Sequence, residues 1–227
     1  MPIKAIAFDA YGTLLDVYSV GALAEQFFPG KGAAIATTWR DKQIEYTRLR
    51  TMCDQYADFW QVTGNGLDYA CALHEVDLTP DMQAALMGAY EELTAFDENL
   101  AQLTRLRKAG VPMAILSNGT HAMINSALTA AKLDGLLDHV LSVDDVGKFK
   151  TAPEAYQMGP DAFGLPAEDI LFVSSNCWDV CGATWFGYHT IWLNRAGLPM
   201  ERLGVEPKAR ARSLKDVADY ALASFSG

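Results

Sequence analysis

The stretch that decides the fold is IKAIAFDAYGT, residues 3–13. Its first six residues are mostly apolar and lead into a turn that contains Gly12, which predicts a buried strand of a parallel sheet with Asp9 at its carboxyl end. In open α/β sheets ligands bind just beyond the carboxyl ends of the strands, so Asp9 is a candidate for chemistry. Aspartate after a strand is also a common turn former or helix cap, and this stretch alone fits both interpretations.

The composition is that of a folded globular protein. The 227 residues can form one large domain or two modest ones, half of them are apolar, and 20% are charged. The formal net charge of −10 and the sequence pI near 4.8 would repel a polyanion or an acidic membrane surface. We therefore expect no nucleic-acid partner and no membrane partner.

The sequence contains no feature that predicts export, membrane insertion or a metal site. The first residues lead directly into a strand without the apolar region of a signal peptide, and no apolar run approaches the roughly 20 residues that span a bilayer. The histidines are scattered, and the cysteines lack zinc-type spacing and are expected to be reduced thiols. We expect a soluble cytoplasmic protein. The cysteines are Cys53, Cys71, Cys177 and Cys181.

From about residue 17 to residue 90 the pattern is helical. It predicts helices over residues 20–28, 33–52, 56–62 and 67–76 and a further helix start at Thr79-Pro80-Asp81, where proline occupies the first helical position. Gly64-Asn65-Gly66 is expected to interrupt the segment between residues 56 and 76.

From about residue 97 strands and helices alternate. Strands are predicted over residues 111–116, 139–143, 170–173 and 190–193, with helices over residues 98–108, 123–131 and 154–163 between them. This alternation predicts an α/β fold, a Rossmann-like parallel sheet core with helices on both faces. The helical segment interrupts it, so we expect a discontinuous core domain, residues 1–15 and 95–227, and an inserted all-helical cap subdomain, residues 16–94.

Polar residues follow four of the predicted strands. Because the carboxyl ends of parallel strands lie at one edge of the sheet, these residues could converge on a single crevice. Four such clusters with different chemistry are hard to explain as turn formers alone. They are Asp9 and Thr13, then Ser117 and Asn118, then Lys150, and then Ser174, Asn176 and Asp179.

With these clusters the chain resembles the haloacid dehalogenase superfamily, and within it the L-2-haloacid dehalogenases (type II). Asp9 with Thr13 matches the first motif of the superfamily, Ser117-Asn118 the second, Lys150 the third, and the segment 174–179 the fourth. The resemblance covers nearly the whole chain, including the helical insertion. It implies a Rossmann-like core, a cap, an aspartate nucleophile and a homodimer.

The dehalogenase branch is indicated by what the motifs lack. The phosphatases of the superfamily carry a second aspartate two residues after the nucleophile, where this chain has Tyr11, and acidic magnesium ligands in the fourth motif, where only Asp179 is acidic. Magnesium requires hard oxygen ligands, usually carboxylates. We therefore expect no metal and no cofactor, with Lys150 as the main positive charge beside Asp9.

The resemblance also implies a set of substrate-binding residues. Arg40 matches the halide-binding arginine of the family, and Tyr156 matches an active-site tyrosine; taken alone, they would be a solvated helix charge and a core residue. Phe59 and Trp178 match positions that line an apolar pocket, and otherwise are packing residues. Tyr11 is included in the set. The chain departs from the family pattern at Thr151, where proline is usual, and at Asp41-Lys42.

The implied reaction is hydrolysis of a short (S)-2-haloalkanoic acid to an (R)-2-hydroxyacid and halide through an ester on Asp9. Arg40 and Asn118 would receive the halide, and Ser117 and Lys150 would bind the substrate carboxylate. Asp179 is the candidate for activating water. The orienting residues would be Thr13, Tyr156, Ser174 and Asn176. Two alternatives stay open, which are a magnesium-dependent phosphohydrolase of the same superfamily and a binding protein that does not turn over.

Overall fold

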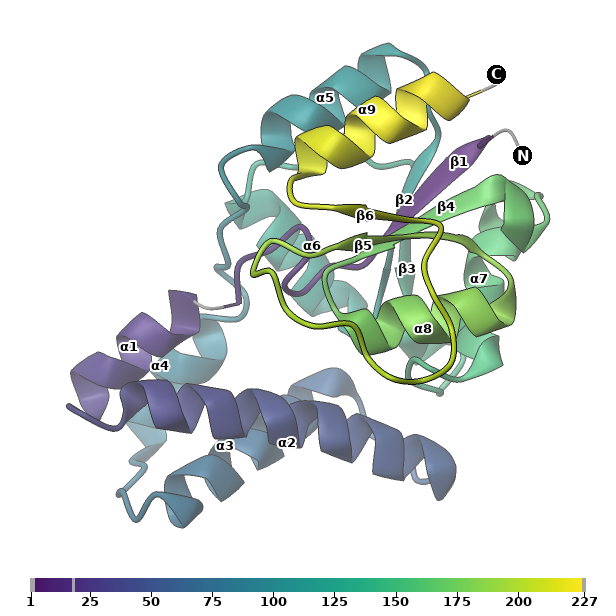
Figure 1. The fold of residues 1–227 in the computed structure, drawn as a ribbon. Coiled ribbons are helices and arrows are strands. Elements are labelled where there is room, and N and C mark those ends of the chain that lie inside the picture. Colours follow the sequence, from purple (N-terminus) through teal and green to yellow (C-terminus); the bar gives the residue numbers. More distant parts are fainter. Residues whose placement is uncertain (1–2, 18, 226–227) are drawn as a thin grey trace.

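A single parallel sheet forms the centre of the molecule (Figure 1). The structure, a computed structural model, describes residues 3–17 and 19–225. Within them the strand order is β3-β2-β1-β4-β5-β6. Ile6 of the central strand pairs with Met113 on one side and with Leu171 on the other. The strands are β1 Ala5–Phe8, β2 Met113–Ser117, β3 His139–Ser142, β4 Ile170–Ser174, β5 His189–Leu193 and β6 Ala209–Ala211.

Helices cover both faces of this sheet, as predicted. Ile6 and Phe8 of β1 point into the larger core, which contains residues of α5 (Asn99–Lys108), α6 (His121–Ala130) and α9 (Leu214–Ser224). Ala5 and Ala7 point to the opposite face, toward α7 (Pro153–Phe163) and α8 (Cys177–Phe186). Side chains alternate along a strand, so a strand that is apolar throughout fits a sheet that is covered on both sides.

Four helices lie between β1 and α5 in the sequence and form a separate lobe at one end of the sheet (Figure 1). They pack mainly against one another. The chain enters and leaves this lobe through two adjacent segments, where the Asp16 amide donates to the Thr94 carbonyl at 2.8 Å and Leu15 bridges to Ala95. The helices are α1 Ser19–Phe27, α2 Gly32–Met52, α3 Phe59–Leu73 and α4 Pro80–Gly88.

The predicted break at Gly64-Asn65-Gly66 is wrong, because α3 runs without interruption from Phe59 to Leu73. Gly66 lies against α2. A Cβ atom added there would be 3.2 Å from Trp39 Cδ1 and 3.3 Å from the Gln43 nitrogen. This glycine therefore allows two helices to approach closely, and the packing outweighs its low helix propensity.

The sequence analysis missed the end of the fold, because it ended at the fifth strand. β6 pairs with β5, and α9 follows it. A sequence signal for α9 was present. The side chain of Ser213 accepts a hydrogen bond from the Asp216 amide, and the Asp216 carboxylate accepts one from the Ser213 amide, which is a capping box. None of the helices within residues 3–17 and 19–225 is long and apolar enough to cross a membrane.

Two glycines of α3 provide a matched pair of substitutions. We expect Gly66→Ala to lower the free energy of unfolding by about 1–3 kcal/mol through overpacking against α2. We expect Gly64→Ala to raise it by up to about 1 kcal/mol, because alanine favours a helix interior and its Cβ would meet only Met87 at 3.8 Å. Urea denaturation of both variants measures the difference. A Gly66→Ala protein as stable as wild type would contradict the role given to this contact.

Candidate active site at the carboxyl end of the sheet

Asp9 lies directly after β1, at the point where the strand order reverses between β1 and β4. The residue is 6% exposed, yet its carboxylate accepts several hydrogen bonds. Oδ2 accepts from Thr13 Oγ1 at 2.9 Å, from Ser174 Oγ at 3.0 Å and from Asn176 Nδ2 at 2.8 Å. Oδ1 accepts from Lys150 Nζ at 3.0 Å. The two oxygens are therefore not equivalent.

The three donors to Oδ2 are themselves fixed by neighbouring backbone groups. Thr13 Oγ1 accepts from the Ser175 amide at 2.8 Å, and Ser174 Oγ accepts from the Asn176 amide at 3.1 Å. Asn176 Nδ2 also donates to the Tyr11 carbonyl at 3.1 Å. Each hydroxyl accepts a hydrogen bond from an amide, which can only donate. Its single hydrogen is therefore directed at Asp9, whose carboxylate can only accept.

Lys150 connects the two carboxylates of the site. It follows the short 3-10 helix Val143–Asp145, and its side chain is 1% exposed. Nζ lies 3.0 Å from Asp9 Oδ1 and 3.0 Å from Asp179 Oδ2. The Lys150 amide donates to Asn118 Oδ1 at 2.9 Å. The peptide bond that joins Lys150 to Thr151 is cis.

The surroundings push the pKa values of the two carboxyl groups in opposite directions. Burial alone would raise the pKa of Asp9, but the Lys150 charge and the hydrogen bonds from Lys150, Asn176 and Thr13 lower it below its usual value. Burial raises the pKa of Asp179 to about 6, against the Lys150 charge and with the help of the Asp9 charge. The pKa of Lys150 is raised, since the two carboxylates outweigh its burial. Asp9 is thus the ionised carboxylate, and Asp179 titrates nearer neutrality.

Tyr156 of α7 binds Asp179 of α8 on the same face of the sheet. Its hydroxyl on α7 donates to Asp179 Oδ1 at 2.8 Å, and Asp179 is fully buried in the first turn of α8. Tyr188 donates to the Tyr156 carbonyl at 2.6 Å. Asp179 therefore has one oxygen bound to a neutral hydroxyl and the other to an ammonium.

A cleft of about 670 Å³ opens between α2 and the start of α8. Its lining includes Arg40 and Arg48 from α2 and Asn176 and Trp178 from the α8 side. Arg40 Nη1 donates to Gln43 Oε1 at 2.5 Å. The cleft thus combines two arginines of the helical lobe with Asn176, which contacts Asp9.

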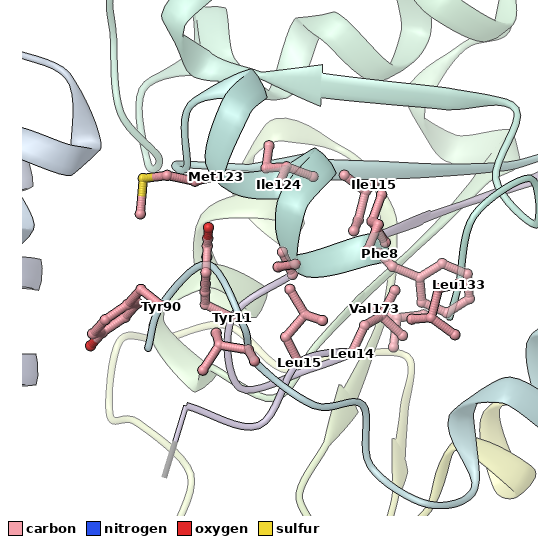
Figure 2. Close-up of a cluster of buried hydrophobic side chains, with 14 of the residues drawn as sticks. Phe8, Tyr11, Leu14, Leu15, Tyr90, Ile115, Met123, Ile124, Leu133 and Val173 are labelled. Carbon is pink, nitrogen blue, oxygen red and sulfur yellow. The ribbon is translucent and has the colours of Figure 1, made fainter. Parts of the chain in front are cut away.

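Aromatic side chains form the apolar part of the site region, and Figure 2 shows two of them, Tyr11 and Tyr90, beside buried aliphatic side chains. Phe59 is buried, with its ring centroid 5.6 Å from that of Tyr11 and 6.2 Å from that of Phe149. Tyr11 also contacts Tyr90 at 6.3 Å. These rings come from both the sheet and the helical lobe.

The second motif lies beside this cluster. Ser117 and Asn118 are buried after β2, and Ser117 Oγ accepts from the Gly119 amide at 3.0 Å. The structure therefore brings all the predicted site residues to one end of the sheet: Asp9, Thr13, Lys150, Ser174, Asn176, Asp179 and Tyr156 as one hydrogen-bonded network, with Ser117, Asn118, Tyr11, Phe59, Arg40 and Trp178 around it.

The sequence analysis did not identify three residues that support the site. Arg195 follows β5 and donates to the Thr13 carbonyl at 3.1 Å and to Ser175 Oγ at 3.3 Å. The rule applied to the other strand ends would have found it. Gln43 is fully buried and binds Arg40, and Arg48 lies 5.1 Å from the Trp178 ring. Both lie within α2, where no local pattern in the sequence sets them apart from the other polar residues of the helix.

The two carboxylates at this site suit an ammonium better than a magnesium ion. Among residues 3–17 and 19–225, no three aspartate, glutamate, histidine or cysteine side chains form a group that could bind a metal. Asp9 and Asp179 each use an oxygen to bind Lys150. The position two residues after Asp9, where the phosphatases of the superfamily carry a second aspartate, is Tyr11, so a magnesium ion would find few carboxylate ligands here.

Residues 3–187 match the family model of the haloacid dehalogenase-like hydrolases. The chain belongs to this family. The resemblance inferred from the motifs is confirmed. The chain is 42% identical over 217 residues to the (S)-2-haloacid dehalogenase of Pseudomonas sp. (strain YL), with 96% of this chain and 94% of that protein covered. It is 43% identical to the haloacetate dehalogenase H-2 of Moraxella sp. (strain B), with 90% and 92% covered.

Solved structures of the family agree with this fold over its whole length. A crystal structure of an L-2-haloacid dehalogenase superposes with a TM-score of 0.96 at 51% identity and covers 98% of this chain and 100% of that chain. The L-2-haloacid dehalogenase from Xanthobacter autotrophicus with chloropropionic acid covalently bound gives a TM-score of 0.90 at 33% identity, with 97% and 98% covered.

Replacing Lys150 by methionine removes the ammonium and leaves two buried carboxyl groups without a cation. We expect Lys150→Met to lower the free energy of unfolding by about 3–5 kcal/mol at about pH 8. The loss should be smaller at about pH 5, because without the cation the carboxyl pKa values rise and both groups protonate more readily. Chemical denaturation at both pH values measures this.

Lys148→Met is the matched control. Lys148 forms an exposed ion pair with Asp54 at 2.6 Å, and its removal should change the stability little at either pH. Equal losses for the two variants would contradict the central position given to Lys150.

Proposed function

We propose that the protein is an (S)-2-haloacid dehalogenase that converts short (S)-2-haloalkanoic acids into (R)-2-hydroxyacids and halide through an ester on Asp9. The observation that carries this proposal is the inequivalence of the Asp9 oxygens: among the described residues three side chains donate to Oδ2, while Oδ1 accepts from the Lys150 ammonium alone. The names of the relatives, and the covalently bound chloropropionic acid in one of them, support the same reaction.

In the first step Asp9 Oδ1 attacks C2 of the substrate. The C2–oxygen bond forms as the carbon–halogen bond breaks, and the halide leaves with the bonding electron pair. A carboxylate is a weak nucleophile. Holding it in line with C2 of the bound substrate can lower the activation free energy by about 7–11 kcal/mol. Arg40 stabilises the departing anion with Asn118, and Ser117 and Lys150 bind the substrate carboxylate.

In the second step water attacks the ester carbonyl carbon of Asp9, and Asp179 accepts the proton. The negative charge that develops falls on Oδ2, where Thr13, Ser174 and Asn176 already donate. One such donor contributes about 2.7–4 kcal/mol to transition-state stabilisation. Collapse breaks the bond between Oδ1 and the carbonyl carbon, the product leaves with that oxygen and takes the proton held by Asp179, and Asp9 is regenerated as a carboxylate when its new hydroxyl releases a proton to solvent. The configuration at C2 is inverted once, in the first step, because the second step breaks no bond to C2.

The helical lobe serves as the cap of this site, in the predicted division into residues 16–94 and a core of residues 1–15 and 95–227. It supplies Arg40 and Phe59, while the core supplies the nucleophile and Trp178. The lobe covers the site and excludes water from it during the first step. The phosphohydrolase alternative is disfavoured, because Tyr11 stands where the phosphatases carry a second aspartate and Asp179 is the only acidic residue of the fourth motif.

Location and assembly belong to the same proposal. A cytoplasmic location fits the four free cysteines, since disulfides are rare in reducing compartments. A homodimer is expected from the resemblance. Size-exclusion chromatography with light scattering tests the dimer, and a monomer at micromolar concentration would contradict it.

The ester intermediate can be detected by isotope labelling. We expect chloride release from (S)-2-chloropropanoate without added magnesium, and its loss in Asp9→Asn. A single turnover in heavy-oxygen water should place one heavy oxygen in the Asp9 carboxylate, because water attacks the ester carbonyl. Peptide mass spectrometry measures the label. Label found only in the hydroxyl of the product would mean direct attack by water and would refute the ester.

Asp179 sets the acid side of the pH dependence. Its pKa is about 6 in the free protein, and in the ester Asp9 carries no charge, which removes one of the causes that raise this pKa. We therefore expect kcat to fall as the pH drops through a value at or below about 6, where Asp179 loses its base form. In Asp179→Asn the ester should accumulate, visible by intact-protein mass spectrometry after acid quench. A kcat that stays constant down to the pH at which the protein unfolds would rule out Asp179 as the base.

A further inference from the structure

The hydroxyl of Tyr11 is an exception among the buried polar groups of the site region. Tyr11 is 3% exposed, and its hydroxyl oxygen has no hydrogen-bond partner within residues 3–17 and 19–225. Nearly all buried polar groups in folded proteins are hydrogen-bonded, and leaving one unpaired is unfavourable. A buried donor without a partner beside a binding site indicates a group that the ligand satisfies.

The position of this hydroxyl is on the second-motif side of the site. A Cβ atom added to Gly119 would lie 2.7 Å from the Tyr11 hydroxyl oxygen, so the hydroxyl is directly against the residue that follows Asn118. The hydroxyl therefore lies beside the segment that carries Asn118, one of the two residues that receive the halide in the proposed reaction.

The neighbouring tyrosine does not supply the missing partner. Tyr90 contacts the Tyr11 ring, but in Figure 2 the two hydroxyls point in different directions. Burial raises the pKa of Tyr11 well above its ordinary value, so its hydroxyl keeps its proton near neutral pH and can donate a hydrogen bond.

We propose that the Tyr11 hydroxyl donates a hydrogen bond to the departing halide, alongside Arg40 and Asn118, and that this donor makes the enzyme more selective for chlorinated over iodinated substrates. The inference rests on the proposed function and adds a residue that determines halogen preference. The phenolic proton stays on Tyr11 throughout, and the halide leaves as the free anion. A smaller halide concentrates its charge and accepts a stronger hydrogen bond, so the O–H group assists chloride more than iodide.

Tyr11→Phe removes only the oxygen atom and tests this selectivity. We expect kcat/KM for (S)-2-chloropropanoate to fall about tenfold and that for (S)-2-iodopropanoate to fall no more than about threefold, within the range of one hydrogen bond to a charged acceptor. Because kcat/KM reports on steps up to the first irreversible one, a slow ester hydrolysis does not mask the effect.

Inhibition constants report on the binding of an anion and not on the rate of carbon–halogen cleavage. The inhibition constant of chloride should rise several-fold in Tyr11→Phe, while that of propanoate, which offers a carboxylate and no halogen, should stay unchanged. Tyr220→Phe is the control, since the Tyr220 hydroxyl of α9 is hydrogen-bonded to His189 at 2.7 Å, at the amino end of β5 and so at the edge of the sheet opposite the site. It should alter neither the chloride-to-iodide ratio nor the chloride inhibition constant.

Thermal unfolding separates the two tyrosines independently of activity. Tyr11→Phe should melt at or above the wild-type temperature, because it removes a buried hydroxyl that has no partner, whereas Tyr220→Phe should melt lower, because it removes a hydroxyl that is hydrogen-bonded. A marked loss of stability in Tyr11→Phe would show that the hydroxyl has a structural partner and would overturn the inference.

The outcomes of this experiment are distinguishable. If the wild-type protein releases halide from none of the 2-halopropanoates, the proposed function itself fails. If it does release halide, but Tyr11→Phe keeps the wild-type ratio and chloride inhibition, only the role of Tyr11 is refuted. A raised inhibition constant for propanoate with chloride unchanged would assign the hydroxyl to the substrate carboxylate and would also overturn the inference.

Discussion

The ammonium of Lys150 is buried between the carboxylates of Asp9 and Asp179, and the rest of the site is arranged around this contact. Two carboxylates and an ammonium removed from water are unfavourable unless their remaining lone pairs are also satisfied. Thr13, Ser174 and Asn176 satisfy Asp9, and Tyr156 satisfies Asp179 (the hydrogen bonds are 2.8–3.0 Å long). The larger number of donors at Asp9 lowers its pKa, while burial and the Asp9 charge raise that of Asp179, which suits the proposed roles of nucleophile and base.

The helical lobe reaches the site through its own internal packing. Gly66 allows α3 to approach α2, and Gln43 of α2 donates to Thr63 Oγ1 of α3 at 2.7 Å. The amide oxygen of Gln43, Oε1, accepts a hydrogen bond from Arg40. The direction of the arginine therefore depends on the distance between two helices. A glycine without a chemical role contributes in this way to the geometry of anion binding.

The sequence predicts those features that depend on local order. Buried strands are continuous apolar runs, so the polar residues after them, such as Asp9 and Ser174, could be placed at one edge of the sheet before the structure was known. The break at Gly64-Asn65-Gly66 was predicted wrongly, because glycine has the same local signature whether it ends a helix or lets another helix approach. The burial of Gln43 and the unpaired hydroxyl of Tyr11 depend on residues distant in the sequence, and no local pattern encodes them. The roles of the individual site residues stay predictions.

The position of β1 also constrains how the chain folds during synthesis. β1 is translated first, but both of its neighbours come much later, since Ile6 pairs with Met113 and Leu171. The central strand therefore leaves the ribosome unpaired, and the four helices of the lobe are complete before either neighbour emerges. Such long-range pairing slows folding and exposes an apolar strand for longer. Nascent chains that stop short of β4 should therefore be the ones that depend most on chaperones.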